Sequence, residues 1–168
     1  MLGAVLIMQA AGATEPSGVH LATTVLKSVC DRVIVFGGEA AGAAAHPLPG
    51  DASELAAVAA ALREAADGHV ALLSADLLHP SSELLRYMAQ VRGSFEAVVP
   101  EHRDGTPEPL MAIYHPSLLR RAEGLVAAGE RELSNLLESA TVRRVSVEEI
   151  AKFGEPERLL ERTGPPSI

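Results

Sequence analysis

One carboxylate in this chain stands where it could hold a metal ion. Asp76 directly follows the apolar run of residues 70–75, and Pro80 lies just beyond it. A short uninterrupted apolar run is typical of a strand buried on both faces of a parallel sheet. Because ligands of open α/β sheets bind beyond the carboxyl ends of the strands, Asp76 could hold a divalent cation against a phosphate. The alternative interpretation is that Asp76 only caps the turn before the next helix.

A second candidate site is the small-residue segment that follows the first predicted strand. Residues 3–8 form the apolar strand, and residues 9–14 read Gln-Ala-Ala-Gly-Ala-Thr. A glycine-containing loop at this place can cradle a phosphate, because its backbone amides can approach the ligand closely. A tight turn is the alternative interpretation, and it is the more common use of a lone glycine such as Gly12.

The histidines and the cysteine receive no catalytic role. Cys30 has no neighbour in the sequence that lowers its pKa, so we interpret it as a packing residue. The six histidines and this cysteine show no zinc-ligand spacing. Five histidines fall in predicted turns or helix starts and are interpreted as surface or capping residues: His20, His46, His79, His102 and His115.

Composition and charge restrict the class of protein. The 168 residues, 48% of them hydrophobic, are enough for one core, so residues 1–168 are expected to form a single domain. A formal charge of −8 excludes a general nucleic-acid binder, since phosphate contacts need clustered Lys and Arg. A single cysteine fits a reducing compartment. No basic residue precedes the apolar residues 1–8, and no run approaches the roughly 20 apolar residues of a membrane span. We predict a cytoplasmic protein with no nucleic-acid or membrane partner.

Strands that alternate with helices position these candidates. The pattern predicts a three-layer α/β/α sandwich with a mostly parallel, Rossmann-like sheet. We expect Asp51 and Glu54 to begin a helix as a capping box, and residues 39–50 to form a surface loop. The expected strands are residues 3–8, 33–36, 70–75, 95–100, 108–114 and 141–146, and the expected helices are residues 20–29, 51–66, 81–91, 115–126, 130–138, 147–151 and 156–162.

Short motifs in the second half are similar to those of a known family. Residues 108–114, Glu-Pro-Leu-Met-Ala-Ile-Tyr, follow Asp104 and Gly105 and resemble a strand with a Gln-Pro-Leu core. Residues 75–80, Ala-Asp-Leu-Leu-His-Pro, match a Cys-Asp-x-Pro strand end. Residues 153–159 stand where the family closes with Asn-x-Asn-Thr-Pro-Glu-Asp-Leu. The chain therefore resembles the MobA-type molybdenum cofactor guanylyltransferases, which share the nucleotide-diphospho-sugar transferase-like fold.

This resemblance implies an activity and a set of site residues. Members transfer GMP from GTP to the molybdenum cofactor with the help of Mg²⁺, so GTP or another nucleotide and molybdopterin are the implied partners. By the match of its strand end, Asp76 is the implied magnesium ligand. Asp51 corresponds in position to a family aspartate just upstream of a Gly-Pro-Leu-x-Gly motif, although the role of a helix N-cap is the simpler explanation. The implied nucleotide-binding residues are Leu6, Ala10, Ala11, Gly12 and Asp51.

The chain departs from the family in the phosphate-binding loop. Met8 and Gln9 stand where the family has two glycines, and no Arg or Lys occurs in residues 9–19. Nucleotidyl transfer needs close backbone amides and positive charge around the phosphates. Arg103 is one possible source of that charge, or else a solvated turn residue. A second class of function therefore stays open, in which the chain is a catalytically inactive relative that binds a nucleotide, a pterin or a protein partner.

Overall fold

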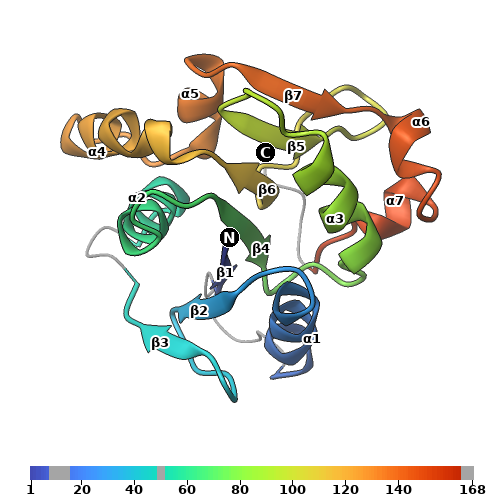
Figure 1. The fold of residues 1–168 in the computed structure, drawn as a ribbon, viewed down its shortest axis with the longest axis horizontal. Helices are drawn as coiled ribbons and strands as arrows, with labels where there is room; N and C mark the ends of the chain where they lie inside the picture. Colours follow the sequence, from blue (N-terminus) through green and yellow to red (C-terminus); the bar gives the residue numbers. More distant parts are fainter. Residues whose placement is uncertain (8–15, 49–51, 164–168) are drawn as a thin grey trace.

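Seven strands form one sheet in residues 1–7, 16–48 and 52–163, the residues that the computed structural model describes (Figure 1). The strands are β1 (Leu2–Leu6), β2 (Arg32–Phe36), β3 (Ala44–His46), β4 (Val70–Ser74), β5 (Ala97–Pro100), β6 (Met111–Tyr114) and β7 (Val142–Val145). Their order across the sheet is β3-β2-β1-β4-β6-β5-β7. β6 runs antiparallel to its neighbours β4 and β5, and the remaining pairs are parallel. The predicted mostly parallel sheet is confirmed.

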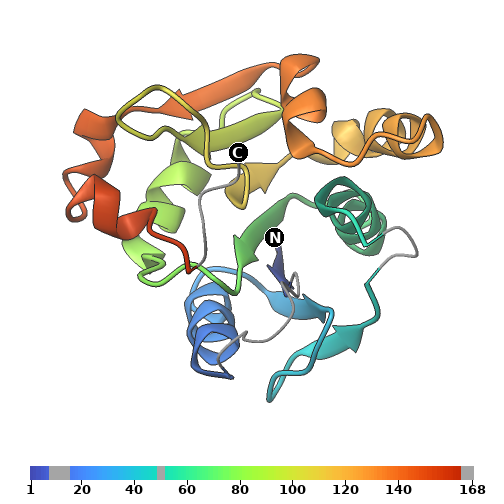
Figure 2. The same cartoon turned by 180° about the vertical axis from the view of Figure 1, so that it is seen from behind.

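Helices cover both faces of this sheet (Figures 1 and 2). One face packs against α2 (Glu54–Glu64), the 3-10 helix η1 (Pro116–Leu118), α4 (Leu119–Ala127) and α5 (Leu133–Glu138). The opposite face packs against α1 (Pro16–Lys27), α3 (Ser82–Gln90), α6 (Val147–Ile150) and α7 (Pro156–Leu159). Each face has its own cluster of buried aliphatic side chains, which confirms the three-layer α/β/α arrangement. None of the described helices is long and apolar enough to cross a membrane.

The two central strands explain the uninterrupted apolar runs of the sequence. All five residues of β1 and all five of β4 are buried, because helices cover both sides of them. The two strands pair in parallel, with Leu6 opposite Ser74 at their carboxyl ends. Asp76 follows two residues later, so the structure places it at the carboxyl edge of the sheet, as predicted.

Several predicted element boundaries were wrong: α1 begins at Pro16 rather than at residue 20, β6 begins at Met111 rather than at residue 108, and two further differences concern β3 and α7. β3 lies inside residues 39–50, which we expected to form a loop; it is an edge strand that pairs only with β2 among the described strands, and its exposed alanines carry no burial pattern. α7 ends at Leu159 rather than at residue 162, so Arg162 belongs to the segment beyond the helix. The differences at β3 and α7 arise because short elements have little hydrophobic periodicity to read.

The helix that we predicted to begin with Asp51 and Glu54 has a different residue as its N-cap. The N-cap of α2 is Ser53, whose hydroxyl oxygen accepts a hydrogen bond of 3.1 Å from the Ala56 amide. Asp51 itself lies outside the described residues. Ser53 therefore provides the N-cap that we had expected two positions earlier.

Glu149 anchors α6 and is expected to make the stability of the protein acid-sensitive. It closes a capping box with Ser146 and accepts hydrogen bonds from Arg143 and Tyr87. Hydrogen bonds from Arg143 are the largest cause that lowers the pKa of Glu149 from 4.5 to about 2. Its stabilising contribution is thus present above pH 4.5 and is lost as the pH falls from there toward about 2.

We therefore expect Glu149→Gln to flatten the pH dependence of the free energy of unfolding in this acid range. Denaturant unfolding at a series of pH values measures it. The matched control is Glu138→Gln, which changes an exposed glutamate and should leave the slope as in the wild type. An unchanged slope in Glu149→Gln would contradict the assignment.

Candidate functional site

An ion pair occupies the carboxyl end of β4. The Arg162 guanidinium donates through Nε to both oxygens of Asp76 at 3.0 Å, and through Nη2 to Oδ2 at 2.7 Å. Both side chains are about three-quarters shielded from solvent, with 25% of Arg162 and 28% of Asp76 exposed. Such a two-point contact is the preferred geometry of an arginine and a carboxylate. The predicted metal ligand is therefore already neutralised by a side chain of the same chain.

The backbone holds Arg162 in this position. Leu77 and Arg162 form an isolated antiparallel bridge. On one side of it the Leu78 amide donates to the Glu161 carbonyl at 2.9 Å, and on the other the Thr163 amide donates to the Asp76 carbonyl at 2.8 Å. We call residues 161–163 the C-terminal strap, because they lie along the turn that follows β4.

A buried carboxylate extends the cluster toward β5 and β6. Glu108 is only 5% exposed, and its Oε1 accepts a hydrogen bond of 3.1 Å from the Leu110 amide. The Arg162 Nη1 lies 4.0 Å from the same oxygen. The Nε2 of His102 lies 3.3 Å from Oε2, and this hydrogen bond is the main cause that raises the pKa of His102. Asp76, Arg162, Glu108 and His102 thus form a row in which carboxylates alternate with Arg162 and, when it is protonated, His102.

A third carboxylate faces this cluster from α2. Burial is the main cause that raises the pKa of Glu54, and the nearby negative charges of Glu108 and Asp76 act in the same direction. Burial works against the charge of Arg162, but the hydrogen bonds and charges of its acidic neighbours outweigh it and raise the Arg162 pKa. Arg162 therefore forms ion pairs with Asp76 and Glu108 and also lies within the electrostatic influence of Glu54.

In this arrangement Asp76 does not fit a magnesium ion. Both of its oxygens accept hydrogen bonds from Arg162. Magnesium prefers several oxygen ligands in near-octahedral geometry. Across residues 1–7, 16–48 and 52–163, no three His, Cys, Asp or Glu side chains gather so that they could hold a metal ion. A divalent cation has no prepared site at Asp76 while Arg162 is bound there.

The other predicted site residues fall in different places. Leu6 ends β1, and its side chain is fully buried in the core, so only its backbone faces the sheet edge. Its carbonyl accepts a hydrogen bond of 2.9 Å from the Ala75 amide, which ties the end of β1 to the residue before Asp76. Ala10, Ala11, Gly12 and Asp51 lie outside the described residues.

The proposed cation source Arg103 is not part of this cluster. It forms an exposed ion pair with Glu157 of α7. Arg162 binds Asp76, and Glu108 and His102 extend the cluster beyond Arg162; the sequence analysis assigned none of these three residues to the site. The only signal in the sequence was a glutamate inside an otherwise apolar stretch, since a buried charge needs a partner.

The first turn of α1 packs closely against the residue before Asp76. A Cβ atom placed on Gly18 would lie 2.2 Å from the Ala75 carbonyl oxygen. Only glycine permits this approach of a helix to the end of a strand. The start of α1, the end of β4 and the C-terminal strap therefore meet at one edge of the sheet.

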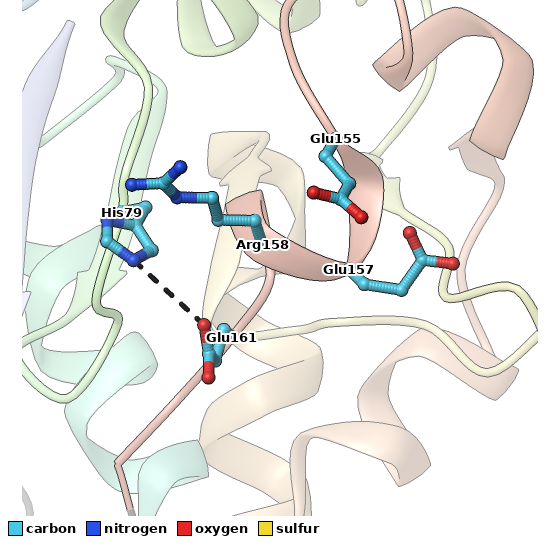
Figure 3. A pocket seen from close by; sticks show the side chains of 5 residues that line it. All are labelled: His79, Glu155, Glu157, Arg158 and Glu161. Carbon is cyan, nitrogen blue, oxygen red and sulfur yellow. Dashed lines mark ion pairs between the residues drawn. The ribbon is translucent and has the colours of Figure 1, made fainter.

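A shallow hollow of about 450 Å³ lies beside the strap (Figure 3). Its lining residues are His79, Glu155, Glu157, Arg158 and Glu161. His79 and Glu161 face each other, with Nε2 and Oε2 3.9 Å apart. Three glutamates against one arginine make this hollow unsuited to a phosphate group.

Solved structures show the class of fold. The molybdopterin-guanine dinucleotide biosynthesis protein A of Archaeoglobus fulgidus superposes with a TM-score of 0.76 at 22% identity, covering 99% of this chain and 93% of that one. A putative protein of Aquifex aeolicus gives 0.79 at 16% identity, with coverages of 98% and 93%. The 2-C-methyl-D-erythritol 4-phosphate cytidylyltransferase of Thermus thermophilus gives 0.64 at 21% identity, with coverages of 99% and 94%. The fold is that of the nucleotidyltransferases.

Sequence comparison then shows the family. Residues 13–146 match the MobA-like NTP transferase domain, and the chain belongs to this family. A probable molybdenum cofactor guanylyltransferase of Deinococcus radiodurans is 41% identical over 86 residues, which are 51% of this chain and 44% of that protein. The match thus spans less than half of that relative. The resemblance drawn from the short motifs is confirmed at the level of the family.

Proposed function

We propose that this protein transfers a GMP unit from GTP to molybdopterin. Membership of the MobA-like NTP transferase family carries the proposal, and a partly matching relative named as a probable molybdenum cofactor guanylyltransferase supports the choice of substrates. In such a transfer a phosphate oxygen of the acceptor attacks the α-phosphorus of the nucleotide, and the bond to pyrophosphate breaks. The edge that holds the ends of β1 and β4 is the expected place for this reaction.

The role of each site residue is part of the proposal. Asp76 is the proposed magnesium ligand, and the proposed nucleotide contacts are Leu6, Ala10, Ala11, Gly12 and Asp51. Because Arg162 holds both Asp76 oxygens, we assign no step of the reaction to the metal. Arg162 brings positive charge to this edge, which the first loop lacks, and His102, whose pKa is raised by its hydrogen bond to Glu108, adds to it when protonated. A cytosolic protein without nucleic-acid partners also remains our expectation.

One observation favours a second candidate function. The ion pair of Asp76 with Arg162 removes the free carboxylate that a metal-dependent transferase would use. In the second proposal the protein is an inactive relative that binds a nucleotide or pterin, or that acts through a protein partner.

An assay with GTP, Mg²⁺ and molybdopterin distinguishes the two candidate functions. Its readouts are the release of pyrophosphate and the formation of the guanine dinucleotide. We expect turnover by the wild type, and a loss of roughly hundredfold or more in Asp76→Asn, the usual size when an electrostatic stabiliser is removed. Asp67→Asn is the matched control, because Asp67 is exposed and lies just before the amino end of β4, away from Asp76 at the carboxyl end. Absence of product together with absence of GTP binding in calorimetry would favour the inactive relative.

A further inference from the structure

We propose that Arg162 competes with divalent cations for Asp76, so that a cation reaches the end of β4 only after Arg162 leaves. The inference rests on the proposed function, because that function calls for a cation at Asp76. Its test nevertheless uses the cation alone, without nucleotide or acceptor. A Mn²⁺ titration that shows no competition would therefore not contradict the proposed GMP transfer. A transfer assay without product would likewise not contradict the competition between Arg162 and the cation.

The geometry makes it unfavourable for Arg162 and a divalent cation to bind the Asp76 carboxylate at the same time. A magnesium ion binds carboxylate oxygens at about 2.1 Å. The guanidinium nitrogens of Arg162 lie 2.7–3.0 Å from the same two oxygens. A divalent ion on either oxygen would stand beside a fixed positive charge in a partly shielded place, where electrostatic repulsion is only weakly screened. The Asp76 carboxylate can thus bind Arg162 or the metal ion, but not both together.

Arg162 has a second carboxylate to which it can move. Its Nη1 already lies 4.0 Å from Oε1 of Glu108, just beyond hydrogen-bonding distance. Glu108 is buried, so a closer ion pair would stabilise its carboxylate against the cost of burial. A short shift of the guanidinium would exchange the Asp76 contact for a Glu108 contact and leave the Asp76 carboxylate to the cation.

The anchoring of the strap limits what has to move. Leu159 and Leu160 are buried in the core at 9% and 3% exposure, so α7 stays in place. Beyond them, two backbone hydrogen bonds join the strap to the turn after β4, from Leu78 to Glu161 and from Thr163 to Asp76. Release of Arg162 therefore needs only a rotation of its side chain or the opening of this short pairing.

Titration of the purified protein with Mn²⁺ alone, followed by the spin-resonance signal of free Mn²⁺, tests the competition. We expect weak binding by the wild type and a dissociation constant roughly tenfold lower in Arg162→Met, because the cation then has no ion pair to displace from Asp76. Adding Asp76→Asn to Arg162→Met should abolish this gain. Arg103→Met is the matched control, since it removes an exposed arginine of equal charge from another ion pair and should bind as the wild type does.

Equal Mn²⁺ affinity in Arg162→Met and the wild type would overturn the proposal, and so would a gain that persists in the double variant. Circular dichroism shows whether Arg162→Met is folded. If it is not, Arg162→Lys serves instead, because lysine keeps the charge but loses the two-point contact. The dissociation constant of Arg162→Lys for Mn²⁺ should then be severalfold lower than that of the wild type. Equal dissociation constants of the two proteins would likewise overturn the proposal.

Discussion

Gly18→Ala should destabilise the protein by about 3 kcal/mol, a large effect for one added methyl group. The new Cβ would lie 2.2 Å from the Ala75 carbonyl oxygen, which belongs to the backbone at the end of β4 and has no side-chain freedom to yield. Either α1 or the end of β4 has to shift. Since Asp76 is the next residue, we expect the shift to weaken transfer activity as well. Denaturant unfolding measures the loss of stability.

Gly124→Ala is the matched control for this prediction. Gly124 lies inside α4, and apart from its chain neighbours and the backbone of its own helix no described atom lies within 4 Å of a Cβ placed there. The same substitution should therefore stabilise the protein by up to about 1 kcal/mol, because alanine favours a helix over glycine. Equal stability of Gly18→Ala and the wild type would show that α1 does not need the close approach.

Removal of the buried carboxylate of Glu108 should also have a large effect. We expect Glu108→Ala to destabilise the protein by about 3 kcal/mol, because it leaves the Leu110 amide without its acceptor and His102 without its charge partner. Glu108→Gln keeps an acceptor oxygen for Leu110 and should cost only about 1 kcal/mol. Equal losses in the two variants would contradict the role assigned to the Leu110 hydrogen bond.

The pH dependence separates the charge of Glu108 from its hydrogen bond. Glu108 raises the pKa of His102 above 6.5, so its stabilising contribution is fully present below pH 6.5 and is lost as the pH rises through the higher value of the folded protein. In Glu108→Gln the His102 pKa should fall, and this part of the pH dependence should disappear. Nuclear magnetic resonance titration of His102 and unfolding at several pH values measure both effects.

Local pattern was sufficient for the central part of the fold. The uninterrupted aliphatic residues of β1 and β4 predicted strands buried on both faces, because only a covered parallel sheet removes all of them from water. The place of Asp76 at the carboxyl edge followed directly from the end of β4. The helix after it, with Ser81 as N-cap of α3, was likewise readable from residue types.

The charge partners of Asp76 were decided by the tertiary structure alone. Arg162 lies 86 residues from Asp76 in the sequence, and no periodic pattern marks the strap that brings them together. Glu108 and His102 join the cluster because β6 turns back beside β4 and β5, which places the segments before and after these strands at one edge. Hydrophobic periodicity reports which residues leave water, whereas ion pairing depends on distances across the folded chain. The sequence thus determined the sheet and the position of one carboxylate, and the folded structure determined that an arginine already binds it.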